Sequence, residues 1–113
     1  MRMWMVNPRL LCRRHLLGEH VELHMLVGHL QRGRSIQGFL ASGLLQPQDL
    51  TSRHDDLVEE MTTRGYQHSS PLGNFPVPPK GTVDIGRSLT ELHQRCPDCK
   101  KRFQEEMKDQ DDL

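Results

Sequence analysis

The feature that most constrains the fold is an apolar repeat of helical period in the first third of the chain. Its residues recur at the spacing of one helix face, at Leu16, Val21, Leu23, Val27 and Leu30. Asn7 followed by Pro8 is typical of the start of a helix, and Gly33 is typical of its end. The sequence therefore predicts one long amphipathic helix between these positions.

Length and composition limit what can accompany this helix. A chain of 113 residues fits one domain with a modest core. Only 35% of its residues are hydrophobic and 4% are aromatic, which leaves little apolar material for strands buried on both faces. We therefore predict a small, single, all-α domain.

Two further helices are predicted, which gives about three helices with irregular Pro/Gly-rich connections. The second runs from Ser52 to Arg64, and the third begins at Ser88 and is broken or kinked by Pro97. The stretches predicted to be irregular are a loop at 31–48 with a short turn around Phe39 and Leu40, an extended linker at 69–81 and a flexible acidic tail at 104–113. The predicted domain accordingly spans residues 1–103.

The charge distribution is more informative than the net charge, which is zero. The first 50 positions contain six arginines and three acidic residues, whereas the last ten residues contain five acids and Lys108. Arginine suits phosphate oxygens because its planar fork can bind them in pairs. A phosphate-binding surface and an ordinary solvated surface are equally compatible with this pattern.

The cysteine count and the chain start predict the compartment. Three cysteines, an odd number, do not make a disulfide framework. The first residues hold no apolar run long enough for a signal peptide or a membrane span. We expect a cytoplasmic protein with reduced thiols and no membrane partner.

Three motifs stand out in the first two thirds of the chain: HLLGEHVEL, the Leu26-Val27-Gly28 that follows it, and the later LVEEMTTRGY. Together they resemble the bacteriophage endonuclease V family of pyrimidine-dimer DNA glycosylases. The most specific part joins His15-Leu16 to Glu19, Glu22-Leu23 and Gly28 at a fixed distance from the chain start. The resemblance covers roughly residues 1–67.

This resemblance implies a nucleophile at the chain start. In that family the amino-terminal α-amine attacks the damaged nucleotide and a helix carboxylate lies about two dozen residues later, which aligns with Met1 and Glu22. Arg2 is large enough for Met1 to be retained. An α-amine with a pKa near about 8 is partly unprotonated at neutral pH, unlike a lysine, and no lysine precedes Lys80. The implied reaction is attack at the sugar C1′ through an imine (Schiff base), then strand cleavage by β-elimination.

The resemblance also implies contacts with damaged double-stranded DNA. Arg2 would hold a phosphate, His15 would orient Glu22 or contact DNA, and Glu19 would be supportive. Further phosphate contacts are expected from Arg13, Arg14, Arg32, Arg34 and Arg53, with His54 near the extruded base. The chain departs from the phage enzymes at Val21 and Met25, where they carry arginines, and lacks their aromatic-rich C-terminal segment. Trp4 is expected in the core rather than stacked on DNA.

Other interpretations stay open at this stage. The chemistry could serve an abasic-site lyase or a glycosylase for another lesion, and a non-catalytic helical binding module would need no chemistry from Glu22. We expect a monomer without a cofactor or metal. The alternative is a zinc site formed by Cys96 and Cys99, spaced as C-x2-C, together with Cys12 and His15.

Overall fold

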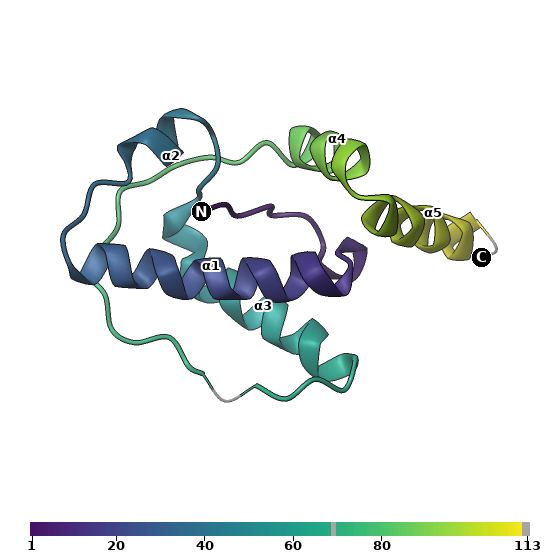
Figure 1. Cartoon of the computed structure of the whole chain (residues 1–113), viewed down its shortest axis with the longest axis horizontal. Helices are drawn as coiled ribbons and strands as arrows, with labels where there is room; N and C mark the ends of the chain where they lie inside the picture. The colour runs from purple at the N-terminus through teal and green to yellow at the C-terminus, as the bar shows by residue number, and fades with distance from the viewer. Residues whose placement is uncertain (69, 112–113) are drawn as a thin grey trace.

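The computed structural model describes residues 1–68 and 70–111, and its regular structure in these ranges is entirely helical (Figure 1). The α-helices are α1 (Arg13–Gln31), α2 (Gln37–Ala41), α3 (Leu50–Thr63), α4 (Ile85–Arg95) and α5 (Pro97–Asp111). Two 3₁₀ turns, η1 (Pro8–Leu10) and η2 (Pro47–Asp49), precede α1 and α3. The all-α prediction is confirmed, but the prediction of about three helices is wrong because there are five.

Proline explains two of the differences from the predicted elements. Pro8 begins the separate turn η1, capped by the Asn7 side chain, and α1 begins only at Arg13 after an extended residue. Pro97 does not end the helical structure; it stands at the first position of α5, where the missing N–H has no helical partner to lose. The chain turns at Cys96, which is extended, so α4 and α5 are two helices.

The end of the chain also differs from expectation. The region predicted as a flexible acidic tail, 104–113, is helical as far as Asp111 because α5 continues through it. Residues 112–113 lie outside the described residues. The expected extended linker does occur, because no helix or strand is assigned in the described residues between α3 and α4, and Figure 1 shows this segment looping around the outside of the molecule.

The core forms where α1 crosses α3 (Figure 1). Helix α1 buries most of the face that the sequence pattern predicted, including Leu16 and Leu23, each at most 1% exposed, but Val21 was wrongly assigned to it and is 56% exposed. Helix α3 adds Leu50 and Leu57 from the other side. Burying a side chain of this size contributes about 1.5–3 kcal/mol, so this crossing is a main source of stability.

The N-terminal segment is part of the core rather than a loose end. Met3, Trp4 and Val6 are at most 6% exposed, which agrees with the expected core position of Trp4. The backbone N–H of Met3 donates to the Leu44 carbonyl at 2.8 Å. The first residue therefore lies inside the outline of the molecule, between α1 and α2 (Figure 1).

The segment leading into α4 is fixed to the loop before α3. Gln48 donates to the Gly81 carbonyl and accepts from the Gly81 N–H, at 2.7 and 3.0 Å. A side chain at position 81 could not fit, since a Cβ there would lie 2.4 Å from the Leu45 carbonyl oxygen. This close approach brings α4 and α5 back over the N-terminal half. None of the described helices is long and apolar enough to cross a membrane.

Candidate active site

Three contacts hold the start of the chain beside α1. The Met3 N–H binds the Leu44 carbonyl, and the Trp4 N–H donates to Glu19 Oε1 at 3.2 Å. The Arg2 guanidinium forms an ion pair with Glu91 of α4. Backbone and side chains thus fix the segment that carries the Met1 amine.

Glu22 lies on α1 within the electrostatic reach of that amine. Burial raises the pKa of the half-buried Glu22 carboxyl, and the positive charge of the Met1 amine is the strongest influence opposing this rise. The neighbouring Glu19 raises the same pKa, and Arg2 lowers it. The amine and the carboxylate that the sequence pairs are separated by 20 intervening residues in the chain, and the charge of the first acts on the second.

Glu19 has a different environment from Glu22. Both its oxygens are bound by Arg53, through Nε at 2.6 Å and a terminal guanidinium nitrogen at 2.9 Å. The remaining guanidinium nitrogen of Arg53 donates to the Val6 carbonyl at 2.6 Å. With side-chain exposures of 0% and 4%, the pair is internal. Glu19 thus joins the chain start to α3 through the Trp4 N–H and Arg53, and Arg53 is not available to a DNA phosphate in this structure.

Arg2 is also engaged. Its guanidinium carbon lies 3.8 Å from the centre of the Trp4 ring, and its side chain is only 11% exposed. Hydrogen bonds from Arg2 and Arg87 lower the pKa of the Glu91 carboxyl to about 2. A DNA phosphate would have to replace Glu91 to reach Arg2, so positioning of the chain start is the role that the contacts of Arg2 support.

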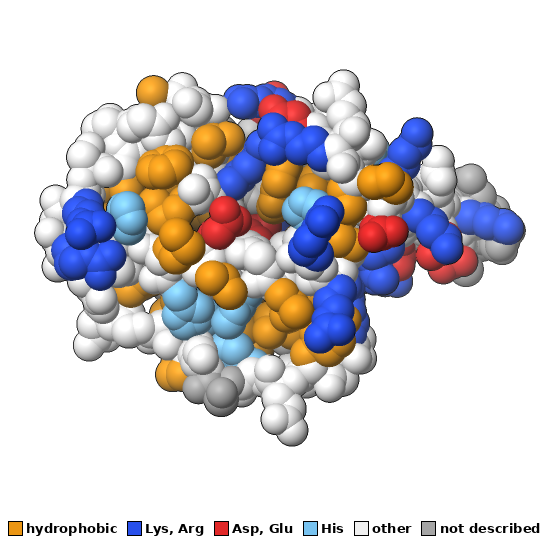
Figure 2. All heavy atoms as spheres, viewed as in Figure 1, with side chains coloured by type: hydrophobic (Ala, Val, Ile, Leu, Met, Phe, Trp, Pro, Cys, Tyr) orange, Lys and Arg blue, Asp and Glu red, His pale blue; other side chains and the backbone are white. Residues whose placement is uncertain are grey.

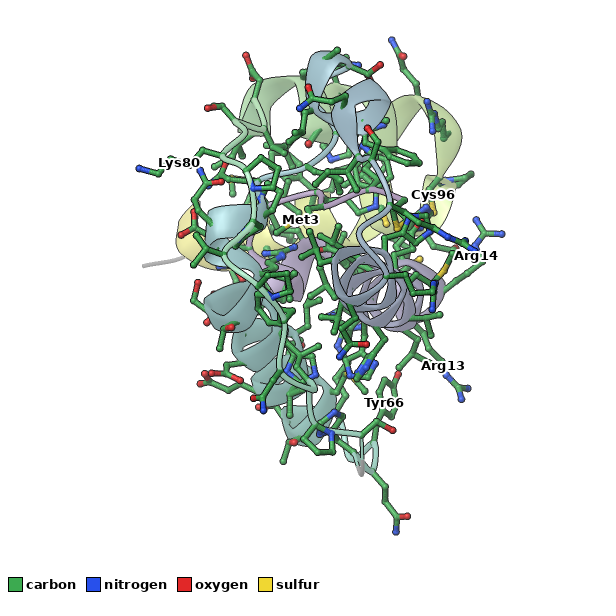
Figure 3. The ribbon with its side chains drawn as sticks, turned by 90° about the vertical axis from the view of Figure 1, so that its left-hand side faces the viewer. Met3, Arg13, Arg14, Tyr66, Lys80 and Cys96 are labelled. Atoms are coloured by element: carbon green, nitrogen blue, oxygen red, sulfur yellow. The ribbon has the colours of Figure 1, made fainter. Side chains whose placement is uncertain are left out.

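The remaining arginines occupy the two ends of α1. Arg13 and Arg14 begin the helix, Arg32 and Arg34 follow its last turn, and all four are exposed. Figure 2 shows basic side chains toward both sides of one face, with acidic side chains in its middle. Figure 3 shows Arg13 and Arg14 projecting on that side of the molecule. With 19 residues, α1 is about 28 Å long, which separates the two basic ends by a comparable distance.

Both histidines predicted for the site, His15 and His54, lie in groups of closely spaced histidine or cysteine side chains. His15 Nδ1 lies 3.3 Å from Cys12 Sγ and 3.5 Å from Cys99 Sγ, and Cys96 completes this group. His54 is 5% exposed and belongs to a second group with His20, His24 and His68. In each group the possible ligand atoms lie within 4.8 Å of one another.

The sequence anticipated the first of these groups only as an alternative, and it missed the second. The i, i+4 spacing of His20 and His24 on a helix was the available local signal. His54 and His68 come from distant parts of the chain, and no sequence spacing connects them to α1. Burial, together with the neighbouring imidazoles, lowers the pKa of His20 to about 4, so this ring is neutral at neutral pH.

A cavity of about 830 Å³ lies elsewhere, between the 5–9 segment, α3 and α5. It carries four acids, Asp56, Glu59, Glu60 and Glu106, beside three arginines. Neither Met1 nor Glu22 lines it. Its acidic lining is unfavourable for phosphate, so the face that carries Glu22 is the better candidate for nucleic acid.

A comparison with known proteins finds a match over the part of the chain that carries the candidate site. Residues 1–74 of the 113 match the family described as pyrimidine dimer DNA glycosylase. This range contains Met1, Glu22 and all of α1–α3, and it ends before α4 and α5. Neither the curated proteins nor the solved structures include a significant match.

Proposed function

Because the chain belongs to the pyrimidine dimer DNA glycosylase family, we propose that it is a DNA-repair glycosylase and abasic-site lyase that uses the Met1 amine as nucleophile and Glu22 as its carboxylate. Family membership itself makes it a DNA glycosylase with a DNA substrate. The observation that supports the finer proposal is that burial raises the pKa of the half-buried Glu22 carboxyl and the positive charge of the Met1 amine opposes this rise.

The proposed reaction follows from an amine held beside a carboxylate. The lone pair of the unprotonated Met1 amine attacks C1′ of the damaged nucleotide, and the bond from C1′ to the base breaks, with its electron pair leaving on the base. The nitrogen loses a proton, and its lone pair then forms the C1′=N bond as the C1′–O4′ bond breaks and O4′ takes up a proton. The resulting imine, protonated on nitrogen, makes the C2′ proton acidic. Glu22 takes that proton, the 3′ phosphate leaves by β-elimination, and water then hydrolyses the imine to free the enzyme.

Glu22 has a second role in the proposal, which is electrostatic. Positive charge develops on the sugar as the glycosidic bond breaks, and a carboxylate fixed nearby stabilises it without reorganisation. Burial of Glu22 strengthens this interaction because less water screens it. Glu19 cannot substitute, since Arg53 already binds both of its oxygens.

The arginines at the two ends of α1 suggest how DNA lies on the protein. The length of α1, about 28 Å, corresponds to about eight base pairs of a duplex placed along it. Arg13 and Arg14 would contact phosphates at one end and Arg32 and Arg34 at the other. Glu22, near the middle of α1, would then face the nucleotide that is extruded from the stack.

The test is reductive trapping with borohydride, performed on untagged protein with an abasic-site duplex and with a dimer-containing duplex. Because only an imine is reduced to a stable adduct, we expect a covalent protein–DNA product whose mass maps to Met1. Acetylation of the amine should abolish it. Trapping on a lysine, or no trapping on either substrate, would refute the proposal, and trapping on abasic DNA alone would restrict it to a lyase.

Glu22→Gln tests the carboxylate. We expect strand cleavage to fall by at least about 100-fold, the usual contribution of one general acid–base group, while duplex binding changes little. Glu59→Gln is the matched control, because Glu59 is an exposed helix acid on α3. Equal cleavage by the two variants would remove Glu22 from the mechanism.

A further inference from the structure

All three cysteines of the chain meet at one point, although position 12 is more than 80 residues from the other two. Cys12 precedes α1, Cys96 lies at the corner between α4 and α5, and Cys99 is in the first turn of α5. His15 Nδ1 is the fourth member of the group. The three thiols are 1–7% exposed, so they face the interior.

The distances within this group are those of a tetrahedral zinc site. With zinc–sulfur bonds of about 2.3 Å and zinc–nitrogen bonds of about 2.0 Å, tetrahedral angles place two sulfurs about 3.8 Å apart and a sulfur and a nitrogen about 3.5 Å apart. Cys12 Sγ lies 3.8 Å from Cys96 Sγ, and the two sulfur–nitrogen distances to His15 are 3.3 and 3.5 Å. A disulfide, in contrast, needs about 2.05 Å.

We propose that Cys12, His15, Cys96 and Cys99 bind one zinc ion. The contacts around the sulfurs support this, because three donors point at them. The Cys12 N–H donates to Cys99 Sγ at 3.3 Å, the Cys99 N–H donates to Cys96 Sγ at 3.5 Å, and the Arg14 guanidinium lies 3.9 Å from Cys96 Sγ. Such donors stabilise the thiolates that a metal needs and orient them.

This zinc is structural in the proposal, since four protein ligands leave no position for substrate. It joins the start of α1 to the α4–α5 corner. Two of its ligands, Cys96 and Cys99, lie beyond the part of the chain that matches the family. His15 then positions the helix that carries Glu22 instead of contacting DNA. Two turns of helix, about 10 Å, separate it from Glu22.

The test replaces zinc with cobalt in the untagged full-length protein. Cobalt bound by three thiolates gives an intense sulfur-to-metal charge-transfer band together with tetrahedral d–d absorption, and we expect both. Cys99→Ser should weaken the charge-transfer band and lower zinc retention during dialysis by at least tenfold. His93→Gln, which alters a histidine outside both groups, should change neither.

Two results would overturn this zinc site. One is a wild-type cobalt spectrum without a charge-transfer band. The other is full reaction of all three thiols with a thiol reagent, at the rate of denatured protein, in the presence of zinc. Both measurements use the wild-type chain, so the proposal can be refuted even if the Cys99 variant does not fold.

An independent observation points to a second metal site. His20 and His24 of α1, His54 of α3 and His68 after α3 bring four imidazoles together, with neighbouring ring centres 4.8–5.3 Å apart. Figure 2 shows a group of histidine side chains on the face of the molecule that is turned toward the viewer. Within the described residues, the Nε2 atom of each is buried and has no hydrogen-bond partner.

Four buried nitrogens without partners need an explanation, because a buried polar group that has lost water and gained no partner destabilises the folded state. We infer that the four histidines coordinate a divalent transition metal of the zinc type, for which neutral imidazole is a preferred ligand. The metal would replace the four missing hydrogen bonds at once. It would join α1, α3 and the segment after α3 at their meeting point.

This second site would also be structural. His20 and His24 each lie two residues from Glu22, and two residues correspond to about 200° around a helix, so the metal and the Glu22 carboxylate lie on opposite sides of α1. The metal would therefore support α1 from the side opposite Glu22, away from the proposed nucleophile.

Metal counting separates the two sites. Native mass spectrometry of untagged, zinc-loaded protein should show two metals per chain, and a mercurial reagent that blocks thiols should release one of them. His68→Gln should lower the count to one and leave the thiolate–cobalt band intact, whereas His29→Gln, a matched change on α1, should leave two. A wild-type count of one that falls to zero with the mercurial would overturn the histidine site.

Discussion

Replacing Arg53 with methionine is the most direct test of how the active-site helix is supported. The substitution keeps the length and most of the volume of the side chain but removes its charge. In the native structure Arg53 donates three hydrogen bonds of 2.6–2.9 Å, two to Glu19 and one to the Val6 carbonyl. Glu19 would be left buried as an anion with only the Trp4 N–H, at 3.2 Å.

The size of the effect follows from burial. Breaking an ion pair of which both members are nearly inaccessible costs about 3–5 kcal/mol, because the remaining charge has lost both water and partner. A domain of this size has a total stability of about 5–15 kcal/mol. Arg53→Met should therefore remove a large part of the free energy of unfolding and lower the melting temperature by about 10–20 °C.

Urea unfolding followed by circular dichroism and Trp4 fluorescence would measure the change, since Trp4 is 6% exposed and contacts Glu19. Adding Glu19→Gln to Arg53→Met should recover at least about half of the loss, because a neutral amide needs no counter-charge. Arg95→Met, at a side chain that is 63% exposed, is the control and should cost about 1 kcal/mol or less. A loss below about 1 kcal/mol for Arg53→Met, or no recovery in the double variant, would refute the reasoning.

Three further predictions address the DNA-binding face, the loop contact and the acid range. Arg32→Ala combined with Arg34→Ala should reduce the slope of log affinity against log salt by about 2, measured by duplex titration, and an unchanged slope would exclude both as phosphate contacts. Gly81→Ala should cost about 1–3 kcal/mol in urea unfolding, because its Cβ would lie 2.4 Å from a backbone oxygen of the facing loop; an unaltered midpoint would contradict that approach. Hydrogen bonding by Arg2 holds the pKa of Glu91 at about 2, below its ordinary 4.5, so this carboxylate contributes stability above about pH 4.5 and loses it as the pH falls toward 2. The stability difference between wild type and Glu91→Gln should therefore be full near about pH 6 and smaller near about pH 3, and a constant difference would count against the ion pair.

The sequence predicted the helices whose signals are local. The apolar repeat ending at Leu30 and the Arg64-Gly65 stop each mark a feature of the structure, because propensity and periodicity act over one or two turns. Pro97 does mark the predicted break, but the sequence did not show that a further helix begins at this residue, because a proline is compatible both with the end of one helix and with the first position of the next. The five-residue helix α2 carries too little periodic pattern to be recognised.

In the candidate site, too, some residues are predictable from local sequence and others depend on how the helices pack. The spacing from the chain start to Glu22 is a property of the sequence, and the structure places the Met1 amine where its charge acts on that carboxyl. The ion pair of Arg53 with Glu19 was not predictable. In the sequence, an arginine that binds phosphate cannot be told from one that neutralises a buried acid until the packing of α3 against α1 is known. His54 was misjudged for the same reason: its partners come from α1 and from the segment after α3.

The part of the chain beyond the family match acts on the N-terminal end at two points. Glu91 of α4 pairs with Arg2, the residue after the proposed nucleophile, and the α4–α5 corner meets the start of α1 through cysteine sulfurs. One ion pair is a single point of contact, too little to fix the position of two helices. A zinc bound by ligands from both parts would contribute far more, because its binding energy becomes folding energy. The metal would therefore keep Glu91 beside Arg2, and through Arg2 it would limit where the Met1 amine can lie relative to Glu22.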